Sequence, residues 1–103
     1  MSLDITTLGK DGKPEFWVSI GLDVHERFLE LAEFYNLQLI QRLSDYWSDV
    51  EFEVHELSAF ETEIETLRDT NDKDQRVRDF LENLLSFVKF AKSKNEKLYA
   101  IAD

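Results

Sequence analysis

Two kinds of side chain in this sequence could do chemistry, namely its two histidines and its many carboxylates. Glu51, Glu53 and His55 stand at alternate positions, and alternate residues of a β-strand share one face, so they could together meet a divalent metal. Side chains two residues apart on a strand are roughly 6.5–7 Å from each other, however, and no second element offers ligands to complete the shell. This pattern is more typical of a charged, solvated sheet edge. We therefore expect no metal site.

The histidines also lack a catalytic setting. His25 lies in the first turn of an expected helix, where exposure to solvent is the default. Neither His25 nor His55 falls in a recognisable triad, zinc or phosphate motif. The chain has no cysteine, which removes thiolate nucleophiles, Cys-based zinc sites and disulfides together. We expect no catalytic residues, no cofactor and no enzymatic activity.

The carboxylates are concentrated in one part of the chain. From Asp45 to Asp72 there are ten acidic residues and one base, Arg68, whereas the thirty-one residues that follow carry seven bases and five acids. Glu61 and Glu65 stand one helical turn apart, where like charges repel each other and cost about 0.2–0.5 kcal/mol per pair. We take the fact that the sequence tolerates this cost as a hint of function. The net charge of −10 disfavours nucleic acid and anionic membranes as partners. We expect a basic protein partner, although the charge could serve solubility alone.

Two adjacent aromatic residues, Tyr46 and Trp47, stand directly before most of these acids. Tyrosine and tryptophan are enriched at the energetic centres of protein interfaces. Consecutive helical residues diverge by about 100°, so at least one of the two must point away from the main apolar stripe; alternatively, both belong to the core or its rim. Our predicted partner-binding surface is the segment 45–56, with these contact residues: Asp45, Tyr46, Trp47, Asp49, Glu51, Glu53 and Glu56.

The first half of the chain predicts a hairpin and then helix. Residues 3–8 and 15–20 have strand character, and the turn between them contains Asp-Gly and Pro. Asp23, followed three residues later by Glu26, is typical of a helix start. An apolar stripe at a period of 3.6 then continues to Trp47, either as one helix or as two that break at Asn36. We favour the break, because asparagine is a good C-terminal cap.

The second half predicts a strand, two helices and a closing strand. Residues 49–55 alternate polar and apolar side chains, as in a half-buried strand with Val50, Phe52 and Val54 inward. Ser58 with Glu61 indicates the start of a short helix, whose apolar stripe is Phe60, Ile64 and Leu67. After a polar loop at 70–74, a long helix has these residues at core spacing: Val77, Phe80, Leu81, Leu84, Leu85, Val88 and Ala91. Residues 98–102 close the chain as a strand.

The order β-β-α(α)-β-α-α-β predicts one α+β (mixed) domain over residues 1–103, with three to four helices packed on a sheet of about four strands. A hydrophobic content of 43% supplies a core of ordinary size. No apolar stretch approaches the roughly 18 residues that a membrane-spanning helix needs, and no secretory signal is visible. We expect a soluble, cytoplasmic protein; its oligomeric state does not follow from the sequence.

This layout resembles the small acidic immunity proteins that protect bacteria from toxins of polymorphic or contact-dependent systems. The resemblance covers the opening hairpin, the acidic run from Asp45 to Asp69, the Glu-Leu-Ser-Ala-Phe-Glu-Thr-Glu-Ile segment at 56–64, and the closing Lys-Leu-Tyr-Ala-Ile-Ala-Asp strand. It implies a basic cognate toxin, such as a nuclease, as partner and no activity of the protein's own. Two alternatives stay open: a protein that self-associates through a patch around Trp17 and Trp47, and a domain that binds a small molecule or metal.

Overall fold

Four antiparallel strands form one sheet in the order β2-β1-β4-β3. The computed structural model describes residues 3–8, 14–70 and 73–102. In chain order, the strands are β1 (Leu3–Leu8), β2 (Pro14–Ile20), β3 (Val50–Phe52) and β4 (Leu98–Ala102). The predicted α+β class and element order are confirmed, as are the first and last strands. The predicted turn between β1 and β2 lies outside the described residues.

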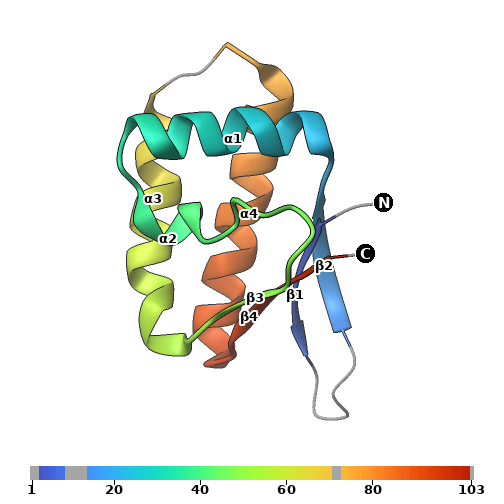
Figure 1. The fold of residues 1–103 in the computed structure, drawn as a ribbon. Helices are drawn as coiled ribbons and strands as arrows, with labels where there is room; N and C mark the ends of the chain where they lie inside the picture. Colours follow the sequence, from blue (N-terminus) through green and yellow to red (C-terminus); the bar gives the residue numbers. More distant parts are fainter. Residues whose placement is uncertain (1–2, 9–13, 71–72, 103) are drawn as a thin grey trace.

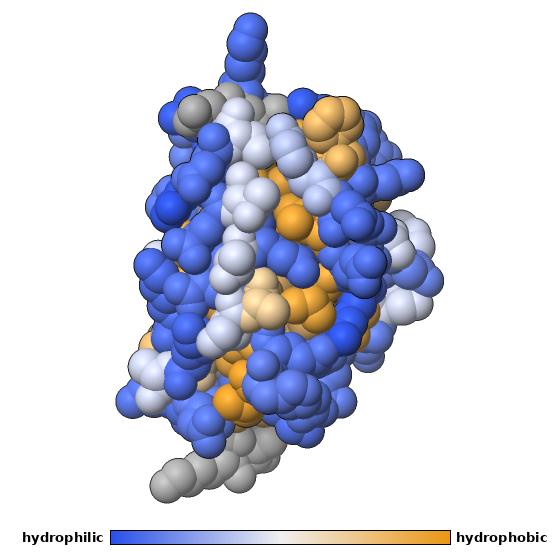
Figure 2. Space-filling view, turned by 90° about the vertical axis from the view of Figure 1, so that its left-hand side faces the viewer, coloured by the Kyte–Doolittle hydropathy of each residue, from blue (hydrophilic) through white to orange (hydrophobic). Residues whose placement is uncertain are grey.

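The helices gather on one side of this sheet (Figure 1). They are α1 (Leu22–Phe34), α2 (Gln38–Gln41), α3 (Leu57–Asp69) and α4 (Gln75–Lys94), with a 3₁₀ turn, η1 (Val54–Glu56), directly before α3. Seen from the side away from the sheet, the helical layer is mostly hydrophilic, with a band of hydrophobic side chains running down it (Figure 2). No helix in the described part of the chain is long and apolar enough to cross a membrane.

The core fills the space between the sheet and the helices. Strand residues that alternate along the sheet, among them Ile5, Phe52 and Ala100, are fully buried against the helices. The ring of Phe52 stacks on that of Phe60 in α3, with the two centroids 4.4 Å apart. The apolar residues that we predicted for α3 and α4 are all buried, which confirms both stripes.

The predicted break at Asn36 is also confirmed. Asn36 adopts a left-handed backbone with φ of 56°, a conformation that asparagine tolerates better than most residues. Its N–H donates to the carbonyl of Glu33 (3.1 Å), and the N–H of Leu37 donates to that of Ala32 (2.8 Å). This pair of bonds ends α1 and turns the chain into α2.

Two predicted helix starts are wrong. Helix α1 begins at Leu22, not after Asp23, because the extended residue Gly21 already offers its carbonyl to the N–H of His25 (2.9 Å). Helix α3 begins at Leu57, ahead of Ser58. Both errors arose from assigning the cap to a side chain that stands inside the first turn.

The third predicted strand is too long, since β3 ends at Phe52 and not at His55. The side chain of Glu53 accepts from the N–H of Glu56, and the side chain of Glu56 accepts from the N–H of Glu53 (3.0 Å). This reciprocal capping box starts η1 and diverts the chain from the sheet. Val54 is therefore the first residue of a helical turn and not an inward strand residue.

Candidate partner-binding surface

Tyr46 and Trp47 lie in the connection between α2 and β3, and they point in different directions. Tyr46 is only 5% exposed, and its hydroxyl donates to the carbonyl of Ile20 at the end of β2 (2.7 Å). Trp47 is 56% exposed, and its ring meets that of Tyr46 edge to face with centroids 5.1 Å apart. Trp47 leaves the core, as expected of at least one of the pair, but not because the two are helical: the predicted second helix ends at Gln41 and does not reach Trp47. Tyr46 cannot contact a partner directly; it supports Trp47 from below.

His25 completes the buried side of this support, and the expectation that it is exposed is wrong. It is 5% exposed, its Nε2 lies 2.6 Å from the carbonyl oxygen of Leu43, and its ring packs edge to face on Tyr46 (4.9 Å). His25 precedes Phe28 by three residues and Ala32 by seven, so all three lie on the inward face of α1. The polar ring is tolerated in the core because the Leu43 carbonyl satisfies it.

Asp45 holds the turn that presents Trp47. Its carboxylate accepts hydrogen bonds from the Ser48 hydroxyl (2.6 Å) and from the N–H of Trp47 (3.0 Å). These hydrogen bonds, chiefly the one from Ser48, lower the pKa of Asp45 below its ordinary value, because they favour the charged form of the carboxylate. Asp45 thus stays negatively charged beside the exposed indole.

The next three predicted contact residues bond to β4 or to Lys97, the residue directly before it. Asp49 is exposed and accepts a hydrogen bond from the N–H of Ala102 (2.7 Å). Glu51 and Glu53 both pair with Lys97, at 2.9 and 3.4 Å. The pKa of Lys97 is raised, chiefly by its hydrogen bond with Glu51. Two of the predicted acids therefore share one base, so they present about half of their formal charge to a partner.

Glu56 is the most strongly engaged of the predicted acids. Its carboxylate pairs with Arg42 at 2.5 Å, and this hydrogen bond, followed by that from the N–H of Glu53, lowers the pKa of Glu56 to about 2. The Arg42 guanidinium also lies 5.7 Å from the centroid of the Phe52 ring. Glu56 therefore fixes the approach to α3, and its charge is already neutralised.

The acids of α3 also have partners within the protein. Glu61 pairs with Lys92 of α4 (2.8 Å), and Arg68 pairs with both Glu65 (3.8 Å) and Asp69 (3.2 Å). Glu63 accepts from the N–H groups of residues 39 and 40 in the first turn of α2, at 3.2 and 3.0 Å. This dense row of acids thus has a structural explanation that the sequence does not reveal.

Among the carboxylates that have no internal base, two lie on α1, outside the predicted segment 45–56. Glu26 and Glu33 form no ion pair with any residue that the structure describes, whereas Glu30 pairs with Arg27 (3.1 Å). They line a groove of about 340 Å³ between α1 and α2, formed by Glu26, Leu29, Glu30, Glu33, Gln41 and Ser44. The spacing of these three glutamates along one helix face was the missed signal. Ser44, which lines this groove, directly precedes Asp45 in the chain.

The suggested metal-binding face does not assemble. His55 lies in η1 and not on β3, so it does not share a strand face with Glu51 and Glu53. Within residues 3–8, 14–70 and 73–102, no group of three or more histidine, aspartate or glutamate side chains could hold a metal ion. Comparison with protein-family models, with curated proteins and with solved structures gave no match for this chain.

Proposed function

We propose that this protein is an acidic protein-binding module that recognises a basic protein. The observation that carries the proposal is the exposed Trp47, which packs on buried Tyr46 and is flanked in the chain by the exposed acids Asp45 and Asp49. We call Trp47, Asp45 and Asp49 the Trp47 surface.

Trp47 is held in a fixed position, which suits a side chain that anchors an interface. A side chain whose position is already fixed loses little conformational freedom on binding, so more of its contact energy appears as affinity. Tyr46 fixes the indole from below through its bond to the Ile20 carbonyl, and Asp45 fixes the backbone of the turn. Buried aromatic anchors of this kind typically contribute about 2–4 kcal/mol to an interface.

The unpaired acids on α1 extend the negative field beyond this anchor. Glu26 and Glu33 line the groove between α1 and α2, and their charges are free to meet lysine or arginine side chains. A negative surface that faces a basic cleft raises association rates by about 10–1,000-fold at low salt. A nuclease active site is such a cleft, because it is shaped to hold phosphates.

We further propose that the basic partner is a toxin and that this chain is its immunity protein. The resemblance of the sequence layout to acidic immunity proteins supports this choice, as does the exposed anchor within a negative field. In this role the protein blocks the toxin by occupying its basic surface and performs no reaction itself.

The experiment uses the gene that precedes this one in its genome. The C-terminal domain of that gene product is produced in bacteria with and without this protein, and cell survival and co-purification are measured. The proposal predicts that the domain is basic, that it kills cells when produced alone, and that co-production restores growth through a stable complex. A domain that is harmless, or that kills equally in the presence of this protein, contradicts the immunity function.

A further inference from the structure

The outer edge of β2 is an unprotected strand edge. β2 is the end strand of the sheet, and its outer side pairs with no other strand among the described residues. Apart from Pro14 and Glu15 at its start, the strand is the uncharged sequence Phe-Trp-Val-Ser-Ile at 16–20. The opposite edge, β3, is only three residues long and carries the Glu51–Lys97 pair. Short edge strands and edge charges prevent strand addition; β2 has seven residues, and its only charge and its proline are confined to its first two positions, so residues 16–20 have neither protection.

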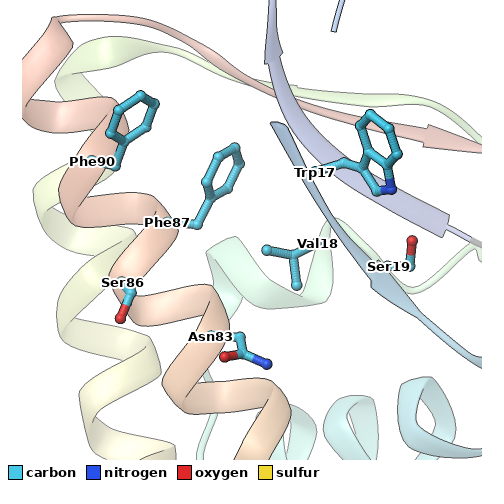
Figure 3. Close-up of a pocket in the computed structure, with 7 residues that line it drawn as sticks. All are labelled: Trp17, Val18, Ser19, Asn83, Ser86, Phe87 and Phe90. Carbon is cyan, nitrogen blue, oxygen red and sulfur yellow. The ribbon is translucent and has the colours of Figure 1, made fainter. Parts of the chain in front are cut away.

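An uncharged stripe of α4 lies beside this edge. Phe87, Phe90 and Val18 point into the space between α4 and β2, while Trp17 lies on the other side of the strand (Figure 3). Together with Ser19, Asn83 and Ser86 they line a groove of about 600 Å³. Trp17 is 61% exposed. Elsewhere α4 is charged, at Arg76, Arg78, Asp79, Glu82, Lys89, Lys92 and Lys94.

We infer that the occupant of this surface is a second copy of the same chain, paired antiparallel through β2. A two-fold axis perpendicular to the sheet joins the two edges into one continuous sheet and places both α4 helices on the same side. Each copy's partly exposed Phe90 then packs at the junction beside Phe87, which is already buried within its own chain, and the two grooves close on each other. The unpaired backbone groups of each edge supply the hydrogen bonds that the other needs.

The charge distribution favours a second copy over a basic partner here. Two molecules of net charge −10 repel each other over most of their surfaces. The uncharged edge and stripe are where that repulsion is weakest, whereas a basic protein is drawn to the acidic groove of α1. The inference does not rest on the proposed function, because it uses β2 and α4 and not the Trp47 surface.

Analytical ultracentrifugation of the purified full chain over a wide concentration range tests the inference. We expect a monomer–dimer equilibrium. Ser86→Glu should raise the dimer dissociation constant at least about tenfold, because the added carboxylates face each other across the axis. The matched control is Ser58→Glu, which adds the same charge at an exposed position on α3 and should leave the equilibrium nearly unchanged. Circular dichroism confirms that both variants fold.

Hydrogen exchange of the amides in residues 16–20 separates strand pairing from helix packing. Pairing through β2 predicts that these amides exchange more slowly at concentrations where the dimer forms than in dilute solution. The inference is overturned by a chain that sediments as a monomer at every concentration. It is equally overturned by a dimer that Ser86→Glu leaves intact, or by one in which the β2 amides gain no protection.

Discussion

The glutamate at position 63 offers a direct test of how the structure uses its acidic residues. Taken from the sequence, Glu63 is one of several acids on α3, and its removal should relieve repulsion or do nothing. In the structure its carboxylate accepts the N–H groups of Leu39 and Ile40. Leu37, the residue that precedes α2, has no side-chain acceptor to cap that helix. Glu63→Ala should therefore destabilise the protein.

The expected size follows from the two bonds that are lost. Helix α2 has four residues, too few to hold together without tertiary contacts. Removing an N-terminal capping side chain costs about 0.5–2 kcal/mol, and a charged acceptor lies towards the upper end of that range. We expect a loss of about 1–2 kcal/mol. For a domain of this size that lowers the unfolding midpoint by roughly 5–15 °C.

Thermal and urea unfolding of matched variants measure this effect. Glu63→Gln keeps one acceptor oxygen and should fall between Glu63→Ala and the parent protein. Glu65→Ala is the control, since the one ion pair that Glu65 forms among the described residues is the long, solvent-screened one with Arg68 at 3.8 Å, and it should change the free energy of unfolding by less than about 0.5 kcal/mol. If Glu63→Ala is no less stable than Glu65→Ala, Glu63 does not cap α2 and the structural explanation of the α3 acids is wrong.

Three further predictions concern stability. The pKa of Glu56 is about 2 instead of 4.5, so its pair with Arg42 stabilises the protein fully above about pH 4.5 and is lost as the pH falls towards 2. Glu56→Gln should therefore be less stable than the parent protein by about 1 kcal/mol at neutral pH, a small value because Arg42 is solvent-screened. In urea titrations this difference should shrink as the pH falls from 4.5 to 2. Tyr46→Phe removes the buried bond to Ile20 and should cost about 1–2 kcal/mol; no loss in urea unfolding would contradict the geometry. Asn36→Ala should cost about 1 kcal/mol at a φ of 56° and Asn36→Gly little or nothing; equal melting temperatures for the two variants would count against it.

Much of the fold follows from periodicity in the sequence. The stripes of α3 and α4 and the limits of β4 could be predicted because each is set by regular burial along one element. His25 could not, although it lies at a core position of α1, because whether an imidazole is buried depends on the carbonyl of Leu43, eighteen residues away. Likewise, the capping box of Glu53 and Glu56 starts η1, which runs directly into α3 at Leu57, so the Ser58–Glu61 motif alone places the start of α3 too late.

The candidate site was harder to predict because charge counts say nothing about pairing. The bases that meet the acidic run come from distant segments: Lys97 is 46 residues from Glu51, and Lys92 is 31 residues from Glu61. The first pair engages Glu51, which the sequence offered as a contact residue, and the second engages Glu61, whose spacing from Glu65 was taken as a hint of function. The unpaired glutamates of α1 are fewer and more widely spaced, so local charge density missed them.

The central claim is that the Trp47 surface anchors a basic protein. The most direct measurement is the binding kinetics of the basic C-terminal domain encoded by the preceding gene, for the parent chain, Trp47→Ala and Asp45→Asn, at several salt concentrations. We predict that Trp47→Ala accelerates dissociation at least about thirtyfold, as expected for an anchor worth 2 kcal/mol or more. Asp45→Asn should slow association and weaken its dependence on salt. Binding that both variants leave unchanged would contradict the claim.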